Sequence, residues 1–144
     1  MNKRDANLQM HTNNANKNNK LIYPELSYPI RGILFEVHNN LGRFSREKQY
    51  AELLALKLET AEMKYCRELV VKGTGNIIDF LIEDKIILEL KAKPFIVKDD
   101  YYQLQRYLQI MNIKLGLLVN FRNRYLKPLR ILKIEKAIFP KFEH

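Results

Sequence analysis

The residues of this chain best suited to chemistry are two acids and a lysine in neighbouring apolar runs. Asp79 lies in the run 76–82, and Glu89 and Lys91 lie in the run 85–91. Both runs are rich in isoleucine and leucine, so they predict adjacent strands, and the short polar turn between them predicts an antiparallel hairpin. A carboxylate in such apolar surroundings is costly unless something compensates its charge. The spacing therefore predicts that the two acids share a positively charged partner.

Side chains alternate between the two faces of a strand, and this alternation predicts how the three residues are presented. Glu89 and Lys91 are expected on one face of their strand, and Asp79 is expected to share its face with Ile77 and Leu81. A divalent cation between the two acids would compensate both, and their hard oxygen atoms favour Mg²⁺ or Mn²⁺ over Zn²⁺. Such a set suits phosphodiester cleavage, because the cation polarises a phosphate and acidifies a water while the ammonium stabilises developing charge.

The distribution of positive charge indicates a polyanionic partner. The formal net charge is +9, and residues 114–144 hold eight lysine and arginine residues against two acids. A basic segment of this kind attracts a polyanion over long range. We therefore predict contact with a nucleic acid, and a basic surface that is simply solvated is the alternative. The predicted nucleic-acid-binding residues are Arg122, Arg124, Lys127 and Arg130.

Composition places the chain among ordinary globular proteins. Of its 144 residues 47% are hydrophobic, so residues 21–144 are expected to form a single domain, and the polar segment 1–20 is expected to be a disordered tail. The sequence contains no stretch of 18 apolar residues, so no membrane span is expected. The N-terminal segment has no apolar core, so no secretory signal is expected. The single Cys66 excludes an internal disulfide and a cysteine zinc cluster. These features predict a cytoplasmic protein.

Hydrophobic periodicity predicts helices and strands in the order α, α, β, β, β, α, β, β. The predicted helices span about 27–42, 45–59 and 99–112, and the predicted strands span about 63–72, 76–82, 85–91, 114–121 and 129–134. Ser27 and Ser45 are the expected N-caps of the first two helices, and Gly42 is the expected stop of the first. This order predicts an α/β (α+β) fold with a mixed central sheet flanked by helices.

Five short segments occur in an order that resembles a known family. The segments are ILFEVHNNLG at 33–42, EKQY at 47–50, ILELKA at 87–92, QLQRYL at 103–108 and GLLVNF at 116–121. This succession resembles the small bacterial GxxExxY proteins, which are grouped with the PD-(D/E)XK nuclease superfamily, and it covers about residues 22–134. An aspartate followed on a β-hairpin by Glu-x-Lys, as in Asp79, Glu89 and Lys91, is the signature of that superfamily.

The resemblance implies a fold, an activity and a set of site residues. It implies a core of the order αβββαβ and a Mg²⁺- or Mn²⁺-dependent nuclease that acts on DNA ahead of RNA. The implied catalytic residues are Asp79, Glu89, Lys91, Glu47 and Gln103, with Tyr50 and Tyr107 in support. Asp79 and Glu89 would bind the metal, and Glu47 would complete or brace its shell. Gln103 matches a glutamine that related nucleases place near the hairpin.

One departure and two alternatives stay open. The glycine of the family's namesake motif falls on Phe44, and Phe tolerates positive φ less well than Gly, so the loop before the second helix is expected to follow a different path. This path decides how closely Glu47 approaches the metal site. One alternative is a non-catalytic nucleic-acid-binding or protein-interaction module, because a fold does not fix a function. The other is a homodimer or a partner protein that supplies further substrate surface.

Overall fold

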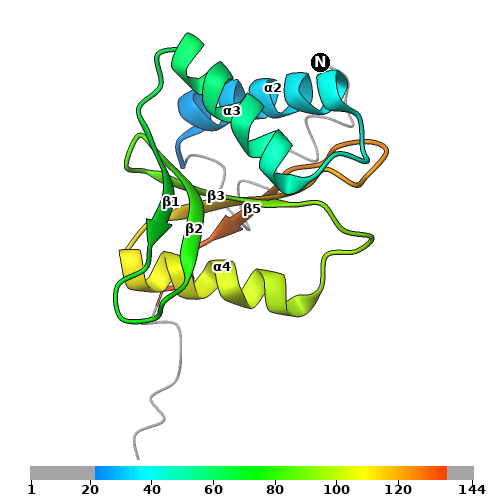
Figure 1. Cartoon of the computed structure of the whole chain (residues 1–144). Coiled ribbons are helices and arrows are strands. Elements are labelled where there is room, and N and C mark those ends of the chain that lie inside the picture. Colours follow the sequence, from blue (N-terminus) through cyan, green and yellow to red (C-terminus); the bar gives the residue numbers. More distant parts are fainter. Residues whose placement is uncertain (1–21, 136–144) are drawn as a thin grey trace, which may run out of the picture.

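The computed structural model describes residues 22–135, which form a five-stranded sheet with helices on both faces (Figure 1). Helices α2 (Pro24–Leu41) and α3 (Glu47–Thr60) cover one face, and helix α4 (Lys98–Met111) covers the other. The strands are β1 (Tyr65–Val70), β2 (Ile77–Ile82), β3 (Ile86–Lys91), β4 (Leu115–Asn120) and β5 (Leu129–Leu132). The predicted mixed class and element order are confirmed, and the predicted tail 1–20 lies outside the described residues.

The two predicted N-caps, Ser27 and Ser45, are wrong. Helix α2 begins earlier, at Pro24, because the fixed φ of proline suits the first turn of a helix. Ser27 is therefore a buried residue inside the helix. Ser45 lies before α3, and its hydroxyl donates to the carbonyl oxygen of Leu41 (3.2 Å), so it fastens the loop between the helices. Gly42 ends α2 at a φ of 75°, as predicted.

The sheet has the strand order β1-β2-β3-β4-β5. Strands β1, β2 and β3 form an antiparallel meander, β4 joins β3 in parallel after the crossover helix α4, and β5 returns antiparallel to β4. The parallel register sets Lys91 beside Asn120, so the C-terminal ends of β3 and β4 meet at one edge. Strand β4 is buried along its whole length, which explains its apolar run without alternation.

Two apolar cores hold the layers together. One lies between the sheet and α2 and α3 and includes Leu34 and Leu88, and the other lies under α4 and includes Ile87 and Leu104. A Cβ atom at Gly116 would stand 2.9 Å from the Leu104 side chain, so this glycine lets α4 approach β4 closely. All three helices of residues 22–135 serve these cores, and none is long and apolar enough to cross a membrane.

Candidate active site

Asp79 and Glu89 face each other where strands β2 and β3 part. The hairpin ladder pairs Phe80 with Leu88, and the two acids are the next residues outward. The backbone N–H of Asp79 donates to Oε2 of Glu89 (2.8 Å), and the N–H of Leu90 donates to Oδ2 of Asp79 (2.7 Å). Each carboxylate thus replaces a regular ladder partner. The antiparallel hairpin predicted from the sequence is confirmed, and it brings the two acids together.

The face predicted for Asp79 is wrong, because β2 does not alternate regularly through this residue. Ile78 packs in the core under α4 and Phe80 packs in the other core, although residues two apart in a regular strand share a face. The residue of β1 that stands opposite Asp79 is Glu68, whose φ of 51° is uncommon for a residue other than glycine. Leu81 packs toward α4, whereas Asp79 lines a hollow beneath α3.

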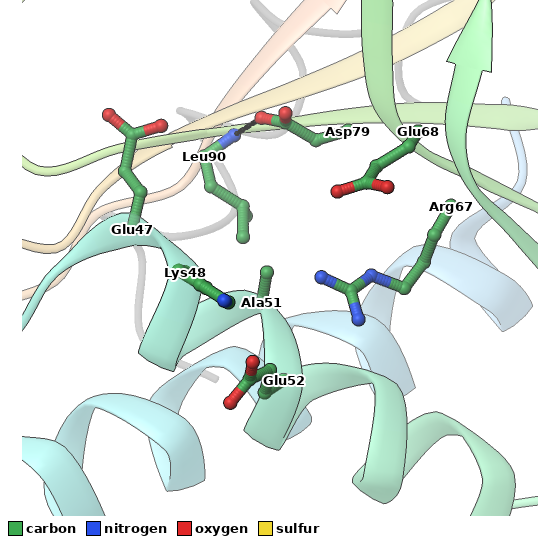
Figure 2. A pocket seen from close by; sticks show the side chains of 8 residues that line it. All are labelled: Glu47, Lys48, Ala51, Glu52, Arg67, Glu68, Asp79 and Leu90. Carbon is green, nitrogen blue, oxygen red and sulfur yellow. Dashed lines mark hydrogen bonds between the residues drawn. The ribbon is translucent and has the colours of Figure 1, made fainter.

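This hollow, called the α3 hollow below, lies between helix α3 and the sheet (Figure 2). Its lining residues are Glu47, Lys48, Ala51 and Glu52 of α3 and Arg67, Glu68, Asp79 and Leu90 of the sheet. Figure 2 shows Glu47 rising from the first turn of α3 toward the sheet, while Arg67 and Glu68 extend from β1 into the same space. The start of α3 therefore brings a third carboxylate toward the hairpin acids.

The charges of the hairpin residues act on Glu47. Burial raises the pKa of Glu47, and the negative charge of Asp79 raises it further. The charge of Lys91 and the backbone N–H of Ala92 act in the opposite direction. The fully buried Tyr50, one turn later, anchors this end of α3 in the core. Phe44 does not adopt positive φ, so the loop reaches Glu47 without the glycine conformation.

Burial dominates the protonation of the two hairpin acids. It raises the pKa of Glu89 from 4.5 to about 8, and the negative charge of Asp79 adds to the shift. Burial also raises the pKa of Asp79, against the lowering effects of the Leu90 N–H and of Lys91. Within residues 22–135 no basic side chain forms an ion pair with Asp79, Glu89 or Glu47. A bound cation would relieve both the burial penalty and the mutual repulsion.

The chemistry of these donors fits a hard divalent cation. Asp79 uses only Oδ2 and Glu89 only Oε2 for its hydrogen bond, so one oxygen of each remains for a ligand. Carboxylate oxygens are the atoms that Mg²⁺ and Mn²⁺ prefer. Within the described residues no three His, Cys, Asp or Glu side chains already surround one point closely enough to hold an ion. A cation held by the hairpin acids would therefore need Glu47 to approach, or water, to complete its shell.

Two lysines share Asp100 at the start of α4. Nζ of Lys93 lies 2.6 Å from Oδ2 of Asp100, and Nζ of Lys91 lies 3.8 Å from Oδ1. Burial acts to raise the pKa of Asp100, but the bonds from Lys93 and from the Val97 N–H outweigh it and lower the pKa overall. Lys91 lowers the pKa of both Asp79 and Glu89, and Lys93 is not a cause of either shift. Lys91 is therefore the lysine that faces the hairpin acids.

Helix α4 carries the predicted pair Gln103 and Tyr107. Tyr107 is buried, and burial followed by the charges of Glu89 and Asp79 raises its pKa, so it lies near the hairpin acids. Gln103 is half-buried one turn earlier on the same side of the helix, and its side chain makes no hydrogen bond within residues 22–135. Its predicted contact with substrate or water stays a prediction.

The structure separates the four basic residues predicted to bind nucleic acid. Arg122 and Arg124 line a second hollow, formed by loops beside the strand ends. Lys127 is exposed in the same stretch of chain. Arg130 turns toward α2, where its guanidinium donates to the Ser27 hydroxyl (3.0 Å). Arg130 therefore has a structural contact of its own, and its role toward nucleic acid stays a prediction.

Sequence reasoning missed three charged residues around the site. Arg67 and Glu68 line the α3 hollow, and the charge of Arg67 lowers the pKa of Asp79. Pairing β1 with β2 in antiparallel register would have placed them opposite Phe80 and Asp79. Asp100 was missed because a local pattern does not reveal that Lys91 and Lys93 reach it.

The hairpin thus places Asp79 and Glu89 face to face where its strands part, with Lys91 two positions after the Glu. The chain belongs to the PD-(D/E)XK nuclease superfamily, because the family model matches residues 24–131. The match contains all of the predicted site residues. The superfamily is generally one of nucleases, which act on nucleic acids. Searches of curated proteins and of solved structures gave no significant match to this chain.

Proposed function

We propose that this protein is a nuclease that hydrolyses phosphodiester bonds with the help of Mg²⁺ or Mn²⁺, and that DNA is its substrate ahead of RNA. The observation that carries the proposal is the facing pair Asp79 and Glu89, two buried or half-buried acids with raised pKa values and no ion pair within residues 22–135. The superfamily match and the net charge of +9 support it. Membership of the GxxExxY group and a cytoplasmic setting are further parts of the proposal.

Five polar residues of the site would take part in this reaction. Asp79, Glu89 and Glu47 would hold the cation, which supplies a Lewis acid for the phosphate and lowers the pKa of a water molecule. Lys91 would orient the attacking water and place positive charge beside the phosphate as its negative charge develops. Asp100 holds the Lys91 ammonium from the α4 side at 3.8 Å. The raised pKa values imply that protons compete with the cation for the acids.

Metal binding and cleavage together test the proposal. Mg²⁺ and Mn²⁺ would be titrated by calorimetry into the wild type, Asp79→Ala and Glu52→Ala, with labelled DNA and RNA incubated in the same buffers. Glu52 lines the same hollow but is not proposed as a ligand, so it is a matched control. We expect Asp79→Ala to lose metal binding and cleavage and Glu52→Ala to keep both. Equal turnover in a Glu89→Ala protein would overturn the assignment.

One observation favours a second function, a nucleic-acid clamp without catalysis. Both hairpin carboxylates are already engaged by backbone N–H groups, and within residues 22–135 no three candidate ligands surround a point. A protein of this kind would bind a polynucleotide and leave it intact at every metal concentration. A homodimer or a partner protein could then supply further substrate surface, and the mass of the complex with substrate in solution tests that possibility.

A further inference from the structure

Three aromatic side chains stand exposed around one hollow at the loop end of the sheet. Phe44 is 75% exposed, Phe95 is 76% exposed and Tyr125 is 79% exposed. They come from three different loops, which join α2 to α3, β3 to α4 and β4 to β5. All three line the same hollow, called the aromatic hollow below. Exposing this much aromatic surface at one place is costly in water, which indicates a surface that contacts a ligand.

Three arginines line the same hollow, and no acid does. Arg43 lies over the Phe44 ring at 4.9 Å and Arg122 lies over it at 5.5 Å, while Arg124 lies over the Tyr125 ring at 5.4 Å. Within residues 22–135 none of these arginines forms an ion pair with a carboxylate. Their positive charge is therefore left for a ligand, and that ligand must be negative.

Backbone contacts hold the aromatic hollow in shape. Nε of Arg43 donates to the carbonyl oxygen of Arg122 (2.8 Å), and an amino group of Arg122 donates to the carbonyl oxygen of Ala92 (3.2 Å), so the three loops are tied together. Nε2 of His38 donates to the carbonyl oxygen of Asn123 (2.9 Å). A surface whose rings and guanidinium groups are already ordered loses little entropy when a flat ligand binds.

The aromatic hollow and the candidate active site are linked through short stretches of chain and the Ala92 backbone. Phe44 precedes Glu47 by three residues, and Phe95 follows Lys91 by four. The Ala92 backbone contacts both regions, since its N–H acts on the Glu47 carboxylate and its carbonyl accepts from Arg122. The loops that carry Phe44 and Phe95 therefore lie a few residues from Glu47 and Lys91.

We propose that the aromatic hollow binds unpaired nucleobases, so that single-stranded nucleic acid is the substrate class of this site. The bases stack on the rings of Phe44, Phe95 and Tyr125, and the three arginines contact the phosphates beside them. Base stacking on aromatic rings combined with a positive groove is the physical basis of single-strand binding. In a duplex the faces of the bases are covered, so only an unpaired segment can use these rings. That single strands are the substrate for cleavage rests on the nuclease function proposed above. The binding of unpaired bases can be tested without cleavage.

Fluorescence gives a direct test, because the chain contains no tryptophan. A Phe44→Trp protein would be titrated in EDTA with a twelve-residue oligothymidylate, an abasic strand of the same length, the matched duplex and heparin. We expect quenching by the oligothymidylate and little change with the other three, since none of them offers an exposed base. Tyr28→Trp is the matched control, because Tyr28 is 68% exposed near the far end of α2. Its emission should not respond to any of the four.

Affinity measurements extend the test to the other rings. Phe44→Ala, Phe95→Ala and Tyr125→Ala should each weaken binding of the labelled oligothymidylate by roughly five- to a hundred-fold. Tyr28→Ala should leave it unchanged, and Phe44→Tyr should restore most of the affinity because it keeps a ring. Equal binding of the abasic strand, or quenching by heparin, would show a surface that recognises charge alone and would overturn the proposal. Absence of nucleic-acid binding in 50 mM salt would also overturn it, and would redirect the surface to a partner protein.

These experiments distinguish a failure of the single-strand proposal from a failure of the nuclease proposal. Selective quenching without cleavage in Mg²⁺ or Mn²⁺ would keep the single-strand surface and reject the nuclease function. Cleavage that Phe44→Ala and Phe95→Ala leave equal on single strands and duplexes would keep the nuclease function and reject the single-strand surface.

Discussion

The α3 hollow and the aromatic hollow both involve the chain around the loop between α2 and α3, which carries Phe44 and leads into Glu47. The two hollows differ in the charge of the side chains that line them. The first is lined by four acids and two bases, and two of the acids, Glu47 and Asp79, have raised pKa values. The second is lined by three arginines and three exposed aromatic rings, with no acid. Acids therefore outnumber bases in the lining of the first hollow, and the charged side chains of the second are all positive. A phosphate chain that carries a divalent cation would satisfy both together.

The two hollows also differ in how far their charged groups are exposed to water. The hairpin acids are buried, so their protonation is set by desolvation and by each other. The arginines of the aromatic hollow are half-buried or exposed, and two of them, Arg43 and Arg122, are held by backbone carbonyls. Dissolved salt therefore screens the attraction between these arginines and a distant anion. Changes in the α3 hollow should therefore alter chemistry and pH dependence, and changes in the aromatic hollow should alter affinity and salt dependence.

The largest effect is expected from Glu89. Glu89→Gln keeps the shape of the side chain but removes a charged metal ligand, so single-turnover cleavage should fall by roughly 10³-fold or more. Arg124→Gln in the aromatic hollow should change the same rate constant far less at saturating substrate. Circular dichroism would confirm that both variants are folded. Similar losses of rate in the two variants would contradict the division of labour between the hollows.

A pH dependence of stability should follow from Glu89 in the metal-free protein. The folded state raises the pKa of Glu89 from 4.5 to about 8, so it binds this proton more tightly than the unfolded state does. The associated stability is fully present below pH 4.5 and is lost as the pH rises toward 8, by an amount on the order of a few kcal/mol. Melting temperatures in EDTA should therefore decline over this range more steeply for the wild type than for Glu89→Gln. Parallel curves would show that Glu89 titrates normally.

Of the two lysines that contact Asp100, only Lys91 is expected to contribute to catalysis. Lys91 lowers the pKa of both hairpin acids, whereas Lys93 lowers the pKa of Glu47 and lies nearer to Asp100. We expect Lys91→Ala to lower the cleavage rate about 10²-fold while metal binding persists, in line with the loss of one charge-stabilising group. Lys93→Ala is the matched control and should cost less than about threefold. Rates and calorimetry measured together check both, and a reversed order would assign the catalytic role to Lys93.

The smallest effect is expected in the salt dependence of binding. In EDTA, Arg124→Gln should weaken binding of single-stranded DNA and reduce the slope of log affinity against log salt by about 0.7, since one phosphate contact is lost. Asp79→Asn removes a negative charge near the path of the strand, so it should strengthen metal-free binding slightly. Fluorescence anisotropy across a salt series measures both. A stronger loss in Asp79→Asn than in Arg124→Gln would reverse the proposed roles of the two hollows.

Sequence patterns predicted the elements well because they are local. Alternation and helical spacing located the hairpin, the buried strand β4 and the three helices of the described residues, and the predicted bounds differ from the observed ones by at most three residues, most at the start of α2. The predicted face of Asp79 failed for a non-local reason. Glu68 on the neighbouring strand adopts positive φ opposite it, and the alternation of β2 breaks at that point.

The candidate site was predictable in part. The types and spacing of Asp79, Glu89 and Lys91 were sufficient to propose a shared cation, because buried acids require compensation wherever they occur. The positions of Arg67 and Asp100 were not predictable, since each depends on a partner strand or helix distant in sequence. Arg122 and Arg130 have the same residue type, yet one lines the aromatic hollow and the other contacts Ser27 of α2.

By itself the sequence determined which groups are available and which elements carry them, because composition and periodicity act over a few residues. Only the tertiary structure decided which of those groups meet. It brought Glu47 to the hairpin acids, raised the pKa of Glu89 by burial, and gathered Phe44, Phe95 and Tyr125 from three loops. Burial and long-range charge depend on every layer packed around a residue, and no local pattern contains that information.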